Sequence, residues 1–296
     1  LRERRRKPDT PEVDGSGLLA AIVAKMRREE PDVPLTRPMP APLWLSFSAI
    51  KAYEDCPRCF YLKYVMKLDE AKTAALSVGD VAHKALEQWL KEGKKAEEEG
   101  LEAPRGAAAL ARLQAIGRER VREWPRNLQR PDDVEERLAA MLDIAFEMHD
   151  PDTLILGIEQ SFKAPYIVDG VTHWLNGKID RVEQLRDNSY RLVDYKTGHP
   201  AKYLLEPKDN DPQMSIYALA LPHVLKLASP EDPAPECPPG VAEYWVISTG
   251  DRGAIPLSSL KLDKARKKID GVIAGMLAGE FGKGSQCKGL CDLLGE

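Results

Sequence analysis

The chain has 296 residues, of which 43% are hydrophobic and 30% charged, and its formal net charge is −4. This composition is typical of a globular protein with enough apolar material for a sizeable core, and no apolar run approaches the ~20 residues that span a bilayer. Because the net charge is negative, any contact with nucleic acid must come from local basic patches.

Residues 1–44 are expected to form a basic, proline-rich N-terminal arm and linker. Residues 1–15 are basic and then rich in Pro, Asp and Gly, which predicts a disordered arm, either solvated or in contact with phosphates. The range 17–28 has the pattern of a short amphipathic helix, and five prolines in 31–42 predict an extended linker. The basic start is not followed by an apolar segment, so we expect no secretory signal and a cytoplasmic location.

Four of the five cysteines fall in two close pairs. Cys56 and Cys59 form CPRC, whereas Cys287 and Cys291 form CKGLC near the end of the chain. An odd cysteine count without a signal favours a reducing compartment over a disulfide framework. Four thiolates in two pairs suit a tetrahedral metal ion or an iron–sulfur cluster that ties the two segments together. Cys237, in a proline-rich loop, is interpreted as a bystander.

Helical patterns dominate the first half of the remaining chain. Ser46 or Ser48 can cap a helix that leads to Cys56, and the aromatic and lysine residues after it either contact nucleic acid or pack with a solvated basic face. The stretch 79–90 predicts a helix with His83 at the edge of its apolar face, a position that fits a structural histidine as well as a ligand. Residues 93–150 predict an inserted helical subdomain, broken near its prolines.

From residue 153 the pattern changes to strands, and one hairpin stands out. The runs 171–185 and 190–195 flank the turn residues 186–188, and a pivot near Asp187 makes cross-strand residue numbers sum to about 374. Asp180 and Asp194 then face each other, and Lys196 shares the face of Asp194 because strand side chains alternate. Glu159, on the preceding strand, could add a carboxylate but reads more simply as a surface residue.

Two opposed carboxylates and a lysine suit metal-assisted hydrolysis of a phosphodiester. Carboxylate oxygens bind Mg²⁺, which can acidify a water, and a lysine can orient that water or stabilise the transition state. The alternative is a surface hairpin with charges on its solvated face. The following helix, 209–227, adds Gln213 and Tyr217 as neighbours on one stripe, with Asp211 as its N-cap.

The remaining patterns predict a strand at 241–248, at best a short one at 257–260, and an amphipathic helix at 262–279. The order of helices, strands, helix, strand and helix indicates an α/β protein in which helices flank a sheet.

The motifs in this order resemble the PD-(D/E)XK nucleases, in particular their RecB-type branch, which includes the AddB nuclease domain and the CRISPR adaptation nucleases with an iron–sulfur cluster. The resemblance covers residues 45–291. It rests on CPRCFY, on the glycine and histidine at 79 and 83, on GKIDR at 177–181, on VDYKTG at 193–198, and on Gln213 and Tyr217.

The resemblance implies a restriction-endonuclease-like mixed central sheet flanked by helices over residues 45–296, with 93–150 as a helical insertion. It implies that His83, Asp180, Asp194 and the Tyr195 carbonyl bind Mg²⁺ or Mn²⁺. Lys196 would be catalytic, and Gln213 and Tyr217 would support the site or contact DNA. Cys56, Cys59, Cys287 and Cys291 would hold a [4Fe–4S] cluster, with zinc as the alternative. The two-plus-two cysteine pattern departs from the usual one-plus-three.

The expected function is therefore a metal-dependent DNA nuclease in repair, recombination or CRISPR-type processing, acting on single strands or ends. The expected partners are DNA and a helicase, recombination or CRISPR adaptation complex, with no membrane. The alternative is a catalytically silent DNA-binding or scaffold subunit that keeps the Cys-bound metal.

Overall fold

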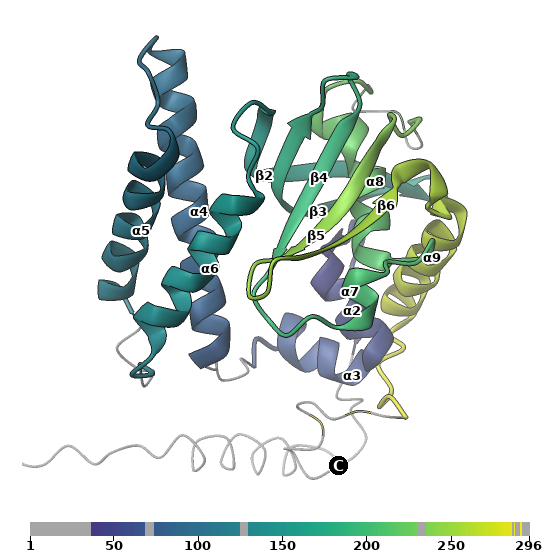
Figure 1. The fold of residues 1–296 in the computed structure, drawn as a ribbon. Helices are drawn as coiled ribbons and strands as arrows, with labels where there is room; N and C mark the ends of the chain where they lie inside the picture. Colours follow the sequence, from purple (N-terminus) through teal and green to yellow (C-terminus); the bar gives the residue numbers. More distant parts are fainter. Residues whose placement is uncertain are drawn as a thin grey trace, which may run out of the picture.

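The computed structural model describes residues 37–68, 74–124, 130–229, 232, 235–285, 287 and 291. In this part of the chain a six-stranded mixed sheet lies between two groups of helices (Figure 1). The strands are paired in the order β1, β3, β4, β5, β6, with β2 paired to β3. The β1–β3 and β4–β5 pairs are parallel and the others antiparallel. The expected α/β fold with a mixed sheet flanked by helices is confirmed. The strands are β1 Trp44–Leu45, β2 Leu154–Val168, β3 Val171–Gln184, β4 Tyr190–Lys196, β5 Gly240–Val246 and β6 Asp251–Pro256.

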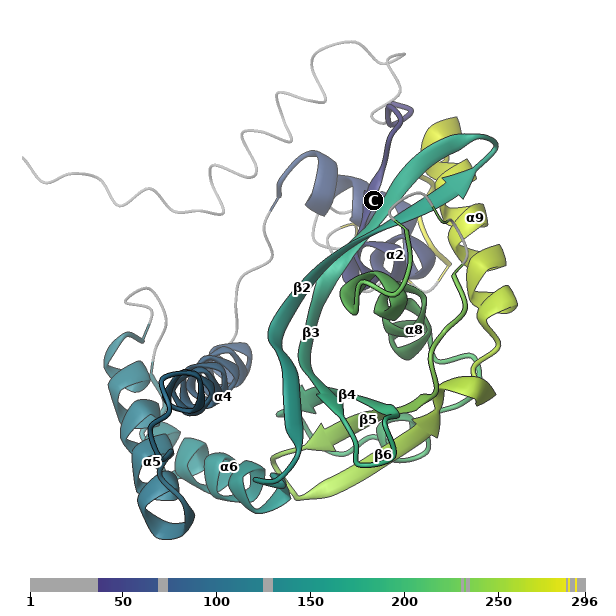
Figure 2. The same cartoon turned by 90° about the horizontal axis from the view of Figure 1, so that it is seen from above.

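The helices fall into two groups, one on each side of the sheet (Figures 1 and 2). The first group is α4 Ala74–Glu98, α5 Gly106–Arg122 and α6 Val134–Met148. The second is α2 Phe47–Asp55, α8 Pro212–Val224 and α9 Leu262–Ala278. Figure 2 shows the long β2–β3 hairpin curving around α8. Shorter elements are α3 Pro57–Phe60, the π-helix Tyr61–Val65, α7 Lys202–Leu205 and the 3-10 helix Leu257–Ser259.

Each helical group has its own hydrophobic core, and alternate residues of the central strands supply both. On β4, Leu192 belongs to the core under α2, α8 and α9, whereas Val193 and Tyr195 belong to the core under α4, α5 and α6. On β5, Tyr244 and Trp245 divide in the same way. Because strand side chains alternate, a strand covered on both faces is hydrophobic throughout, and polar residues within it are costly unless they are paired. The buried polar residues at the end of β4 are therefore the ones to explain.

The β3–β4 hairpin has the register that the sequence predicts. Its described pairs run from Gln184 opposite Tyr190 to Arg181 opposite Val193, so the residue numbers sum to 374. The next positions in this register are Asp180 and Asp194. The β3–β4 pairing ends before these two positions, while β4 pairs with β5 along its whole length.

Several elements differ from expectation. Helix α4 does not end at residue 90 but continues through Gly93 to Glu98, so the segment 93–150 shares a helix with the stretch before it. The short strand expected at 257–260 is wrong, because Leu257–Ser259 is a 3-10 helix. The edge strand β6 was missed because only Gly253 and Ile255 of its six residues are buried, which leaves little apolar pattern. The helix expected at 17–28 lies outside the described residues. No helix among the described residues combines the length and apolarity needed to cross a bilayer.

Candidate active site

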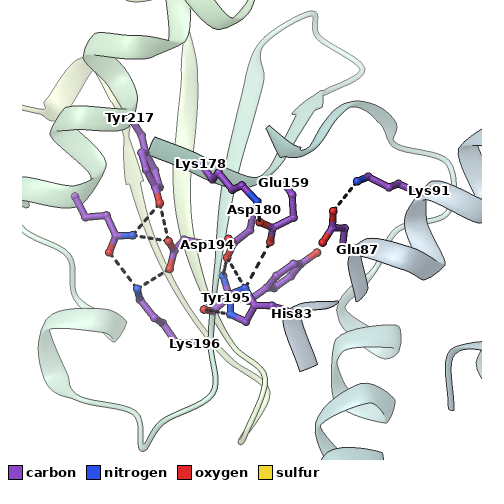
Figure 3. Close-up of polar contacts among 11 residues, drawn as sticks. His83, Glu87, Lys91, Glu159, Lys178, Asp180, Asp194, Tyr195, Lys196 and Tyr217 are labelled. Atoms are coloured by element: carbon purple, nitrogen blue, oxygen red, sulfur yellow. Dashed lines mark hydrogen bonds and ion pairs between the residues drawn. The ribbon is translucent and has the colours of Figure 1, made fainter. Parts of the chain in front are cut away.

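The end of β4 and the start of α8 build a buried polar cluster. One carboxylate oxygen of Asp194 lies 2.7 Å from Lys196 Nζ, and the other accepts hydrogen bonds from Gln213 Nε2 at 2.5 Å and Tyr217 Oη at 3.0 Å. Lys196 Nζ also donates to Gln213 Oε1 at 3.0 Å. Figure 3 shows Asp194, Lys196 and Tyr217 converging from two elements. The cluster therefore fixes the lysine by two contacts while its ammonium keeps further donor capacity.

Helix α8 is positioned for this cluster by its first residues. Asp211 caps the helix by accepting a hydrogen bond from the Met214 amide at 2.9 Å, and Pro212 occupies the first helical position. Tyr244 of β5 donates to the same Asp211 carboxylate at 3.1 Å, which ties the helix start to the sheet. Gln213 and Tyr217 follow one turn apart on the inward side, and Gln213 Nε2 also donates to Tyr217 Oη at 2.9 Å.

A second group, from α4, β2 and β3, lies beside the first (Figure 3). His83 Nδ1 lies 3.5 Å from Asp180 Oδ2 and 3.7 Å from Glu159 Oε1, and His83 Nε2 lies 3.2 Å from the Tyr195 carbonyl oxygen. Asp180 Oδ2 accepts a hydrogen bond from the Tyr195 amide at 2.7 Å. The peptide unit after Asp194 thus joins the two groups, because its amide contacts Asp180 and the next carbonyl faces His83.

Burial and charge act on this site in opposite directions. Burial opposes protonation of His83, but the carboxylates of Asp180 and Glu159 outweigh it and raise the pKa of His83 to about 10. Burial first, and the negative charge of Asp180 second, raise the pKa of the Asp194 carboxyl, while Lys196 opposes that shift. Three carboxylates, those of Glu159, Asp180 and Asp194, thus surround a protonated His83, and a divalent cation bound there would displace the proton of this histidine.

Glu159 is a residue whose position the sequence interpretation got wrong. It was taken for a surface glutamate, yet its side chain is 16% exposed and faces His83. In the β2–β3 ladder Ile158 pairs with Arg181 and Gln160 with Ile179, so Glu159 lies level with Asp180. Its φ of +45° is in the left-handed region, which is uncommon for a residue other than glycine. The pairing of β2 with β3 therefore brings the carboxylate of Glu159 to the site.

Helix α4 can approach the sheet closely because of Gly79, one turn before His83. A Cβ at position 79 would lie 2.7 Å from the Thr197 hydroxyl oxygen, just after Lys196. Beside this contact a cleft of about 960 Å³ opens between α4, α6 and the sheet, and it is lined by residues that include His83, Lys84, Arg137, Glu159, Lys178 and Asp180. The candidate site therefore faces a space that a polymer chain can enter.

The second group fits a divalent cation. One ligand atom from each of His83, Glu159 and Asp180 lies within 4.8 Å of the others, and the Tyr195 carbonyl is adjacent. Carboxylate and carbonyl oxygens are the donors that Mg²⁺ and Mn²⁺ prefer. Asp194, which the family resemblance lists as a ligand, is outside this group of three because its carboxylate is turned toward Lys196, Gln213 and Tyr217.

The two cysteine pairs meet at the C-terminal end of α2, where Cys56 is the C-cap. Cys59 Sγ lies 3.1 Å from Cys287 Sγ and 3.2 Å from Cys291 Sγ, and Cys56 Sγ lies 3.8 Å from Cys291 Sγ. All four sulfur atoms lie within 4.8 Å of one another. Burial opposes ionisation of Cys56, but amide donors from Gly284 and Cys59 outweigh it and lower the pKa of this thiol to about 7. Four thiols gathered in this way are a ligand set for one tetrahedral ion or for an iron–sulfur cluster.

A comparison with protein families gives a match over most of the chain. The family model described as the PD-(D/E)XK nuclease superfamily matches residues 44–293. Twenty chains of solved structures match. One of these, described as the crystal structure of SSO0001, covers 87% of this chain and 86% of its own at 11% identity, with a TM-score of 0.37. No curated protein matches the chain.

Proposed function

The chain belongs to the PD-(D/E)XK nuclease superfamily, and from this premise we propose that it is a metal-dependent DNA nuclease that uses Mg²⁺ or Mn²⁺. The observation that carries the proposal is the juxtaposition of the two groups described above. The buried Asp194 and its half-buried partner Lys196 lie directly beside the potential cation ligands His83, Glu159 and Asp180. A structural hairpin has no need to bury this many charged groups in one place.

The first role is the binding of the divalent cation. Asp180 and His83, with the Tyr195 carbonyl and Glu159, would hold a divalent cation, and Asp194 would be a further ligand. When bound, the cation supplies Lewis acidity to the phosphate and lowers the pKa of a water.

Lys196, held by Asp194 and Gln213, would orient the attacking water or donate to the phosphate oxygen on which negative charge develops. Tyr217 shares the carboxylate of Asp194 with Gln213 and so keeps both residues in place.

The test is a cleavage assay with a chelator control. The wild type should cleave DNA with Mg²⁺ or Mn²⁺ and lose activity in EDTA. Lys196→Ala should lower kcat by at least about 100-fold, the scale of losing one donor to a developing charge. Lys202→Ala, at an exposed lysine six residues along the chain, is the matched control and should cleave normally. Equal activity in wild type, Lys196→Ala and Asp194→Asn would refute the assignment.

We further propose that the nuclease acts as an exonuclease on single strands or DNA ends. Exonuclease action on single strands or ends predicts cleavage of linear single-stranded DNA and protection of the same sequence as a closed circle. Cleavage of both at equal rates would show an endonuclease. The silent-scaffold alternative predicts binding without cleavage under all metals, and the same assay decides it. The helicase, recombination or CRISPR adaptation partner and the cytoplasmic location stay predictions.

For the cysteine site we propose a bound metal centre, a [4Fe–4S] cluster with one tetrahedral zinc ion as the alternative. Four cysteine thiolates are a ligand set for both, and the four sulfur atoms lie within 4.8 Å of one another. The centre would join α3 to Cys287 and Cys291.

A further inference from the structure

One face of the β2–β3 hairpin is left open to solvent between the candidate active site and β1. On β3, Leu175 and Ile179 point into the core, while the alternate residues Trp174, Asn176 and Lys178 lie on the opposite face. On that face Lys178 is exposed, Trp174 is half-buried, and the side-chain oxygen of Asn176 is buried. On β2 the outward residues are Ser161 and Lys163, which pair with Lys178 and Asn176. We call these five residues together with Trp44 the outer strip.

The outer strip ends in an aromatic pair, of which Trp44 is exposed and Trp174 is half-buried. The rings of Trp44 and Trp174 stack with centroids 5.7 Å apart, and Lys163 Nζ lies 4.2 Å from the first centroid and 4.1 Å from the second. Trp44 is 53% exposed, among the most exposed large apolar residues of the described chain. A tryptophan contributes to stability mainly by burial, so an indole left in water on a rigid strand is a stacking surface that the fold does not use.

The charge of the outer strip suits a polyanion. It contains two lysines and no acidic residue. Lys163 has no carboxylate partner within the described part of the chain, and its ammonium is held on the two indole rings by cation–π contacts. Lys178, which lines the active-site cleft, lies 3.5 Å from Glu159 at the other end of the strip. A basic track with an aromatic platform is the combination that binds single-stranded nucleic acid.

The strip is also continuous with the candidate active site. Trp174 is six residues from Asp180 on the same strand, a distance of about 20 Å at ~3.3 Å per residue. Figure 2 shows that this strand runs without a break past α4, which carries His83. A strand whose phosphate lies at Asp180 and Glu159 can therefore follow the hairpin to the tryptophan pair over a few nucleotides.

From these contacts we infer that the outer strip is the binding track for the single strand of DNA on one side of the scissile phosphate. Lys178 and Lys163 contact successive phosphates, and one base stacks on Trp44. This inference rests on the proposed nuclease function. It adds to that function a contact that fixes the polarity of the bound DNA strand, because the strand is held on only one side of the scissile phosphate. A protein partner or a second copy of the chain is the competing occupant, and the experiment below separates them.

The experiment measures binding of the full chain to a linear single-stranded oligonucleotide in EDTA, so that no cleavage occurs. We expect DNA to quench tryptophan fluorescence and Trp44→Ala to remove most of the quenching. Trp44→Ala should also weaken binding by about 5- to 150-fold, the range measured for one base–aromatic stack. Tyr203→Ala, at a residue 63% exposed on α7, is the matched control and should bind as the wild type does.

Two further measurements test the outer strip even if Trp44→Ala does not fold. Lys163→Gln should lower the slope of log affinity against log salt by about 0.7, as for one phosphate contact, and Lys202→Gln should leave it unchanged. A single abasic site moved along an oligonucleotide should weaken binding at one position a few nucleotides from the cleavage point. In Trp44→Ala that position should lose its effect.

The outcomes separate this inference from the proposed function. If the wild type cleaves DNA while Trp44→Ala and Lys163→Gln bind and quench normally, the strip is refuted and the nuclease stands. If DNA binding depends on Trp44 but no metal supports cleavage, the strip stands and the nuclease is refuted. If Trp44→Ala changes the oligomeric state and leaves DNA binding unchanged, the surface is a protein interface and the inference is overturned.

Discussion

Removing the charge of Glu159 is the sharpest test of the candidate cation site, because it changes one atom in a residue that the pairing of β2 with β3 brings to the site. Glu159 Oε1 lies 3.7 Å from His83 Nδ1, and the side chain is 16% exposed, so water screens its charge only in part. In Glu159→Gln the shape is kept and one negative charge is lost. Changes at groups that support a metal site typically cost 10- to 100-fold in affinity. We therefore expect Mn²⁺ to bind about 10- to 100-fold more weakly, which corresponds to about 1.4–2.8 kcal/mol.

The assay is calorimetric titration of Mn²⁺ into wild type, Glu159→Gln and a matched control, Glu87→Gln. Glu87 lines the same cleft one turn after His83, but its carboxylate pairs with Lys91 at 2.5 Å. The control carries the same change of net charge, so it reports the long-range part of the effect. An affinity in Glu159→Gln equal to that in Glu87→Gln would refute the placement of Glu159 among the ligands. A loss of binding in both variants would show that the cleft attracts cations only through its total charge.

Four further predictions follow from the same contacts. Folding raises the pKa of His83 to about 10, and a histidine must be neutral to bind a metal ion. The affinity for Mn²⁺ should therefore rise with pH between about 7 and 10. Calorimetric titrations in buffers of different ionisation enthalpy should show that binding releases about one proton at about pH 7.5. Gly79→Ala should be less stable than Gly93→Ala in urea denaturation, because a Cβ meets nothing within 4 Å at position 93, where alanine should stabilise α4 by about 0.5–1 kcal/mol. Asp211→Ala should lower the free energy of unfolding by about 1–2 kcal/mol, since it removes the cap of α8 and the acceptor of a buried tyrosine. Protein purified without oxygen should carry metal on the four thiols, either about four irons per chain with a broad absorbance near ~400 nm or, for the alternative, about one zinc without that absorbance; protein with neither metal would contradict the site.

The sequence was sufficient to predict those features that depend on local chemistry. The turn at residues 186–188 and the alternation on both sides of it set the β3–β4 register, and a slip of one residue would have turned Asp194 away from α8. Ser46 and Asp211 were predicted as caps, and both accept hydrogen bonds from amides three residues later. In each case the signal lies within a few residues, and so a pattern read along the chain contains it.

Glu159 shows where this kind of inference ends. By alternation Glu159 lies on the same side of β2 as the exposed Ser161 and Lys163, and along the sequence it cannot be told from a solvated residue. It belongs to the site because β2 pairs with β3 so that it lies level with Asp180, and because α4 stands close enough for His83 to meet it. Two strands and a helix from another part of the chain must be placed before the carboxylate can be assigned to the site. The same holds for the four thiols, whose pairs are visible in the sequence but which gather only when segments far apart in the sequence meet.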